Sequence, residues 1–272
     1  IPGSVTSIGD HAFYGCSSLN SITLPDSVMS IGNNTFRGTA YYSDETNWID
    51  GVLYIGNHLI KAMSDKLPSA YSIRVGTKCI ADFAFDGCTK LTNITISDSV
   101  ASIGTWSFRN CPIETAMMPV FAINYIESNN LKTVVITTGK SIGDSAFSGC
   151  TNLTSITIPD SVMSIGYGAF QDCLSLTSIT IPDSVTRIGS SAFSNCSSLT
   201  SVVIPAKADV GEKAFYSCKS LTSVTLTGVR RLRSGVFSGC TKLSELIYEG
   251  EENEWRYVIK ASDWDSGAGA YT

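Results

Sequence analysis

The stretch from Ile142 to Cys196 contains one motif three times: Ile142-Gly-Asp-Ser-Ala-Phe-Ser-Gly-Cys150, Ile165-Gly-Tyr-Gly-Ala-Phe-Gln-Asp-Cys173 and Ile188-Gly-Ser-Ser-Ala-Phe-Ser-Asn-Cys196. The cysteines that end these motifs are 23 residues apart. A linker such as Leu153-Thr-Ser-Ile-Thr-Ile-Pro-Asp-Ser-Val162 joins each motif to the next. A fixed period of roughly 20 to 50 residues is typical of stacked units that cannot bury their apolar faces alone. The stretch therefore predicts a repeat solenoid.

The phenylalanine of the motif recurs along almost the whole chain. It stands at nine positions: Phe13, Phe36, Phe85, Phe108, Phe147, Phe170, Phe193, Phe215 and Phe237. Most steps are 22 or 23 residues, but two steps are 49 and 39 residues. We therefore predict a single solenoid domain over residues 1–272, with insertions at about 39–71 and 113–130 and a C-terminal cap at about 249–272. Because residue 1 falls inside a repeat, we also expect further residues upstream.

Alternation of apolar and polar residues within one repeat predicts the fold. Leu153, Ile156 and Ile158 alternate with serine and threonine, as in a short strand with one buried face. Pro159 ends the strand because it has no N–H to donate. A second extended piece and a helical or 3₁₀ turn over residues 169–176 close the coil. The predicted fold class is an α/β-type solenoid: a right-handed superhelix with a parallel sheet of short strands and 3₁₀ or short helical turns on the other side.

The insertions and the C-terminal segment depart from the repeat. Gly56-Asn57 between two apolar runs predicts a β-hairpin that extends the sheet. In the second insertion, residues 119–126 suggest a short helix or irregular coil. Near the end, Trp255, Val258 and Ile259 share one face of a predicted helix, which would shield the last apolar layer.

The net charge and the histidine content argue against several classes of function. The net charge is -5, so we expect no attraction to nucleic acid, and no run of about 18 apolar residues predicts membrane insertion. The chain has two histidines, His11 and His58, and neither lies in a metal-binding or catalytic motif. We predict no enzyme, no catalytic or metal-ligating residue and no cofactor.

Nine cysteines are the main candidates for redox or metal chemistry. Eight of them occupy one repeat position: Cys16, Cys88, Cys111, Cys150, Cys173, Cys196, Cys218 and Cys240. Side chains repeated along a stack point into the core rather than at one another, so we predict buried, reduced thiols. Disulfides or a metal site are the alternatives.

A second polar position of the repeat is an aspartate that precedes a serine, at Asp26, Asp98, Asp160 and Asp183. Both side chains are expected to bond to the backbone of their own turn. Calcium binding by the aspartates is the alternative.

The repeated pattern Ile-Gly-x-x-Ala-Phe-x-x-Cys-x-x-Leu-x-x-Ile-x-Ile-Pro-x-x-Val resembles the BspA-like, treponemal-type leucine-rich repeat family. Residues 51–62, Gly-Val-Leu-Tyr-Ile-Gly-Asn-His-Leu-Ile-Lys-Ala, and residues 254–264 also resemble segments of such proteins. The resemblance implies a bacterial protein, often from a gut or host-associated species, that is secreted or held at the cell surface. It also implies adhesion and protein binding, with no catalytic residues.

Two sets of residues are candidates for ligand binding. One is the outward face of the strands: Ser155, Thr157, Ser178, Thr180, Ser201, Ser223 and Thr225. The other is the aromatic group at the base of the first insertion: Tyr41, Tyr42 and Trp48. Hydroxyl side chains also simply suit an exposed sheet, and the aromatic residues also suit packing of the insertion.

We predict a non-enzymatic, surface-displayed recognition or adhesion module. Its expected partner is a host or microbial surface protein or glycan. The alternatives are a structural spacer in a surface protein and a carbohydrate-binding accessory module. No oligomeric state is predicted.

Overall fold

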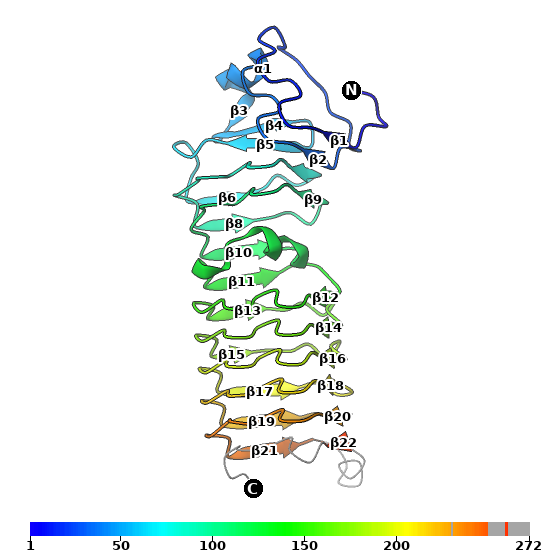
Figure 1. Ribbon diagram of the computed structural model, residues 1–272, viewed down its shortest axis with the longest axis vertical. Helices are drawn as coiled ribbons and strands as arrows, with labels where there is room; N and C mark the ends of the chain where they lie inside the picture. The colour runs from blue at the N-terminus through cyan, green and yellow to red at the C-terminus, as the bar shows by residue number, and fades with distance from the viewer. Residues whose placement is uncertain (230, 250–258, 261–272) are drawn as a thin grey trace. The chain divides into compact units, whose positions relative to one another are not determined.

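The computed structural model describes residues 1–229, 231–249 and 259–260. It divides into two compact units. Unit 1 comprises Ile1–Met118 and Asn124–Glu127, and unit 2 comprises Pro119–Ile123 and the residues from Ser128 onward. Each unit is a stack of short strands, most of them parallel, with little helix (Figure 1). Among the described residues, no helix has the length and apolar character needed to cross a membrane.

Each coil of unit 2 contributes one strand to each of two columns, and the strands within a column run parallel to one another. The longer strands are β11 (Thr133–Ile136), β13 (Ser155–Thr157), β15 (Ser178–Ile179), β17 (Ser201–Ile204), β19 (Ser223–Leu226) and β21 (Glu245–Tyr248). The two-residue strands are β12 (Ser141–Ile142), β14 (Ser164–Ile165), β16 (Arg187–Ile188), β18 (Asp209–Val210), β20 (Arg231–Leu232) and β22 (Ile259–Lys260). In the second column Ser141, Ser164, Arg187, Asp209 and Arg231 are register partners in turn.

The repeated phenylalanines stack inside unit 2, as the sequence predicts. Phe147, Phe170, Phe193 and Phe215 have no exposed surface. The centroids of successive rings are 5.2, 5.1 and 5.0 Å apart, and the rings are tilted by 1°, 5° and 7° in the same order. This spacing is close to the ~4.8 Å distance between neighbouring strands. Identical residues at one repeat position therefore come into van der Waals contact along the stack.

The repeated cysteines line the same core. All nine cysteines are free thiols, and the eight other than Cys16 are buried, as predicted. The Sγ of Cys196 donates to the carbonyl of Phe170 at 3.1 Å, and later coils repeat this bond. Burial raises the pKa of Cys88 to about 11, so its thiol stays protonated at neutral pH. Cys16 is exposed, so the prediction of burial is wrong for this cysteine.

The predicted 3₁₀ or short helical turns are wrong for the regular coils, which contain isolated turns instead. Two residues of each turn adopt positive φ, such as Ser191 (56°) and Asn195 (60°). The N–H of Phe193 between them donates to Ala214 in the next coil at 2.7 Å. A helix would direct these N–H groups to carbonyls of the same turn. Bonding between coils therefore replaces helix formation.

The Asp-Ser turn also differs from its prediction. The serine hydroxyls donate to carbonyls of the preceding coil: Ser184 to Val162 at 2.6 Å and Ser161 to Gly139 at 2.9 Å. Each of these serine hydroxyls bonds to a carbonyl of the neighbouring coil in preference to the backbone of its own turn. These serines therefore connect coils rather than close a local turn.

Unit 1 has the same two columns, interrupted by the first insertion. The two-residue strands are β1 (Ser7–Ile8), β2 (Ser30–Ile31), β7 (Cys79–Ile80) and β9 (Ser102–Ile103). The other column is β6 (Ala70–Ser72), β8 (Asn93–Thr95) and β10 (Thr115–Met118), in parallel. The insertion forms α1 (Ala40–Ser43), η1 (Glu45–Asn47), β3 (Trp48–Ile49), β4 (Val52–Ile55) and β5 (His58–Ala62).

Strands β4 and β5 pair antiparallel, and Gly56-Asn57 joins them. Strand β5 then pairs in parallel with β7, so the insertion takes a place in the second column. After β10 the chain forms two 3₁₀ helices, η2 (Val120–Tyr125) and η3 (Ser128–Asn130). The first part of the predicted second insertion is therefore a regular strand, β10, and the irregular segment begins after it. The predicted cap at 249–272 lies almost wholly outside the described residues, but Ile259–Lys260 form strand β22 and not part of the predicted helix.

Candidate functional site

The predicted serine and threonine face lies on the outer side of the longer strands. Ser155, Thr157, Ser178, Thr180 and Ser201 are exposed, and Ser223 and Thr225 are half-buried. Ser178, Ser201 and Ser223 are direct register partners on successive strands. This surface offers hydroxyl groups on a regular lattice but neither charge nor aromatic anchors. Its role in binding stays a prediction.

The aromatic residues at the base of the insertion are half-buried and contact one another. The indole N–H of Trp48 donates to the carbonyl of Tyr42 at 2.8 Å, and the two rings meet edge to face at 5.1 Å. The hydroxyl of Tyr41 donates to the carbonyl of Tyr54 at 3.1 Å. Burial raises the pKa of Tyr42 above its usual value. These contacts fix α1 against the hairpin and favour the packing alternative for Tyr41, Tyr42 and Trp48.

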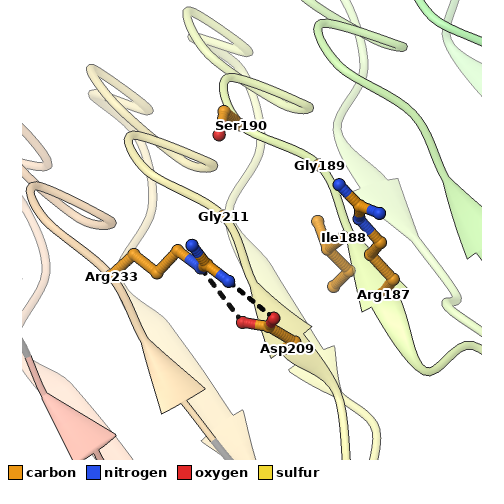
Figure 2. Close-up of a pocket in the computed structure, with 7 residues that line it drawn as sticks. All are labelled: Arg187, Ile188, Gly189, Ser190, Asp209, Gly211 and Arg233. Atoms are coloured by element: carbon orange, nitrogen blue, oxygen red, sulfur yellow. Dashed lines mark hydrogen bonds and ion pairs between the residues drawn. The ribbon is translucent and has the colours of Figure 1, made fainter.

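Unit 2 has a hollow on its surface that was not predicted from the sequence as a binding site. A cavity of about 440 Å³ lies along β12, β14 and β16, with Tyr167 and Arg187 among its lining residues. A smaller cavity of about 70 Å³ adjoins it and shares Arg187, Gly189 and Ser190 (Figure 2). We call the two together the arginine groove. It follows the second column of short strands.

Glycine backbone helps to form this groove. A Cβ atom added to Gly189 would lie 2.5 Å from the backbone of Gly166 in the preceding coil, and Gly166 and Gly211 are crowded in the same way. Glycine at these three positions permits the close approach of successive coils. The missing side chains leave a hollow beside the column, bordered by larger residues from neighbouring positions.

The charged side chains that line the groove are Arg187, Arg233, Asp144 and Asp209. The guanidinium of Arg233 binds the carboxylate of Asp209 with two hydrogen bonds, at 2.8 and 3.2 Å (Figure 2). These bonds hold the pKa of Asp209 below its usual value, and the charges of Arg231 and Arg187 add to the effect. Figure 2 shows the guanidinium of Arg187 apart from this pair. Arg187 is exposed and makes no ion pair with any of the described residues.

This arrangement is suited to binding an acidic group. A guanidinium presents a planar set of N–H donors that matches a carboxylate or a sulfate. Tyr167 is 55% exposed and adds an aromatic surface on the same groove. The described lining residues include no histidine or cysteine that would act as a general base or nucleophile.

A signal for the groove is present in the sequence. Arg187, Asp209 and Arg231 stand at the repeat position that serine holds at Ser141 and Ser164. Arg233 stands where the other coils of unit 2 have glycine. These breaks in the repeat mark the site, but the strand register is needed to see that they lie side by side.

The sequence matches a known family model and several solved structures. The model of the BspA type leucine rich repeat region matches residues 1–65, 61–133 and 125–244, in six copies. No curated protein matches. A leucine-rich repeat protein from T. pallidum is 27% identical, with 72% of this chain and 75% of that chain covered and a TM-score of 0.40.

Two further solved structures are similar. A leucine rich cell surface protein from Faecalibacterium prausnitzii is 25% identical, with 96% and 81% of the two chains covered and a TM-score of 0.46. A leucine-rich repeat protein from Bacteroides ovatus is 22% identical, with 91% and 82% covered and a TM-score of 0.44. The six copies of the family model extend over most of the sequence and agree with the motif that repeats from Phe13 to Phe237. The chain therefore belongs to the BspA-type leucine-rich repeat family.

Proposed function

We propose that this protein is a non-enzymatic recognition module that is displayed at a bacterial surface and binds a protein or glycan partner. The family resemblance of the repeats supports display and adhesion. The arginine groove supports recognition of an acidic group on the partner. One observation carries the proposal: Arg187 is exposed beside a cavity of about 440 Å³, with no ion pair among the described residues.

The partner would present a carboxylate or sulfate to Arg187. A guanidinium is more weakly hydrated than an ammonium group, and its bidentate contact orients the ligand. The fixed pair between Arg233 and Asp209 borders the same groove and restricts the approach of the partner. The serine and threonine face would add contact area without fixing specificity, since it lacks aromatic and arginine anchors.

The test is a binding array of surface proteins and glycans, including sulfated and uronic acid-containing polysaccharides. We expect Arg187→Ala to weaken binding to an acidic partner by about tenfold or more, as for loss of a charged hydrogen bond. Lys219→Ala is the matched control, because Lys219 is an exposed cation of unit 2 outside the groove.

Loss of binding in both variants would indicate nonspecific attraction to positive charge. If the wild-type protein binds no component and deletion of the repeats leaves cell adhesion intact, the spacer alternative replaces the proposal.

A further inference from the structure

A separate cavity of about 330 Å³ lies within unit 1, at the turn that follows β9. Thr105, Trp106 and Arg109 line it from that turn. The segment 124–127 lines it with Tyr125 and Glu127 among others. Aromatic rings and polar groups therefore meet in a hollow at the lower end of the size range of small-molecule sites.

The repeat sets the backbone conformation of Trp106 but does not require its large side chain. The φ of this residue is 58°, in the left-handed region that disfavours bulky residues. The equivalent position has positive φ in the other described coils as well, where it holds His11, Asn34, Phe83, Ser145, Gly168, Ser191, Lys213 and Gly235. Trp106 is 56% exposed, so burial recovers little of this conformational cost. A large aromatic side chain is thus held at the surface against the local backbone preference.

Neighbouring residues fix the position of the cavity wall. The guanidinium of Arg109 binds Asp86 through two hydrogen bonds, at 2.8 and 2.7 Å. It lies 5.5 Å from the ring centroid of Trp106 and 5.1 Å from that of Phe83. The carboxylate Oε1 of Glu127 accepts from the backbone N–H of Asn110 at 2.9 Å, which ties segment 124–127 to the turn. The wall is therefore largely ordered before a ligand arrives.

Polar groups with unused bonding capacity surround the aromatic rings. Within the described part of the chain, the Thr105 hydroxyl and the Asn124 amide make no side-chain hydrogen bond. Glu127 uses one carboxylate oxygen, and Asp86 engages only the Nε and Nη2 of Arg109. Both donors and acceptors thus remain available beside the exposed surfaces of Trp106 and Tyr125.

We propose that this cavity binds a neutral saccharide ring. A pyranose presents a face of C–H groups, which stacks on an aromatic ring, and a rim of hydroxyls that both donate and accept hydrogen bonds. The charge of Arg109 is already matched by Asp86, and Glu127 would repel an anion, so the cavity differs in ligand chemistry from the arginine groove. The inference rests on the proposed recognition function and names the ligand class of a second site.

The test is affinity electrophoresis in native gels that contain a soluble neutral polysaccharide: a β-glucan, a galactomannan or a xylan. We expect at least one polymer to retard the protein and Trp106→Gly to reduce the apparent affinity by at least about tenfold. Glycine adopts positive φ readily, so this variant should keep its fold, as an unchanged urea midpoint would show. Tyr14→Ala is the control, since it removes an exposed aromatic ring that lines neither this cavity nor the arginine groove.

Two results would overturn the inference: no retardation by any of the three polymers, or equal retardation of the wild-type and Trp106→Gly proteins. The proposed function fails separately. If an acidic partner binds through Arg187 while no neutral polymer retards the protein, only the saccharide inference falls. If Trp106 mediates retardation but no acidic partner depends on Arg187, the arginine groove loses its role.

Discussion

The regular coils of unit 2 and the hairpin segment of unit 1 bury polar groups in different ways. In unit 2 one solution recurs, as each buried thiol from Cys196 to Cys240 donates to a phenylalanine carbonyl of an earlier coil. In the hairpin the solutions are individual: the Nζ of Lys61 donates to the carbonyl of Phe83 at 2.6 Å. His58 is fully buried, with Nε2 3.1 Å from the carbonyl of Pro25.

One buried polar atom of the hairpin has no hydrogen-bond partner in the described part of the chain. Among the buried side chains of the described residues, the Nδ1 of His58 lacks a hydrogen-bond partner. An unsatisfied buried polar atom destabilises a fold by about 1–3 kcal/mol. In a repeat, one hydrogen-bonding arrangement for a buried polar group recurs in many coils. In an insertion, each buried polar group needs a hydrogen-bond partner of its own. We therefore expect the two regions to differ in their response to mutation and pH.

The largest expected effect is the loss of a ring from the phenylalanine stack. Phe170→Ala should lower the free energy of unfolding by ~3–5 kcal/mol, because it leaves a cavity between two stacked rings. Phe13→Ala should cost distinctly less, since Phe13 is only half-buried and stacks on one ring, Phe36. Urea denaturation measures both. A loss below about 1 kcal/mol for Phe170→Ala would contradict a coupled core.

The next effect tests the close approach of coils. Gly189→Ala should destabilise unit 2 by about 1–3 kcal/mol, since the new Cβ would lie 2.5 Å from the backbone of Gly166. Gly143→Ala is the matched control at the same repeat position, where a Cβ meets no atom within 4 Å. Thermal unfolding compares the two variants, and equal melting temperatures would show that the coils separate at little cost.

The third prediction concerns His58. Burial lowers its pKa, and this outweighs the hydrogen bond to Pro25 and the charge of Asp26, which act in the opposite direction. Below the unfolded-state pKa of about 6.5, the unfolded chain therefore binds a proton that the folded chain does not. Stability should fall as pH decreases below about 6.5, by at most about 1.4 kcal/mol per pH unit from this group.

The measurement is urea denaturation at several pH values between about 7.5 and 5.5. His58→Gln should flatten this part of the stability profile, because glutamine does not titrate. His11→Gln provides the control, since His11 is exposed. The interpretation is wrong if His58→Gln and the wild-type protein lose stability equally on acidification.

The smallest expected effect is on the outward strand face. Ser178→Ala should change the free energy of unfolding by less than about 0.5 kcal/mol, because the side chain is exposed. Chemical denaturation with an unchanged slope is the check. A larger loss would mean that the hydroxyl lattice stabilises unit 2. The comparison of unit 2 with the hairpin would then have to include this face.

Much of the fold follows from the repeat, whereas the candidate site does not. The spacing of Phe147, Phe170 and Phe193 predicts their contact directly, because equal positions on successive coils are neighbours. The absence of helix in the turns was not foreseen, since it depends on N–H groups bonding to the next coil rather than to the same turn. Trp48 was expected to be a possible anchor, but its indole bonds to Tyr42 within the insertion.

The sequence by itself determined the period, the inward residues and the buried thiols, because these depend on local alternation repeated many times. Only the tertiary structure decided where binding groups gather. Arg187 and Asp209 are 22 residues apart in sequence, but the strand register makes them neighbours. Trp106 and Tyr125 share a cavity because segment 124–127 packs back on the turn after β9. Such contacts join residues outside the repeat, so periodicity carries no information about them.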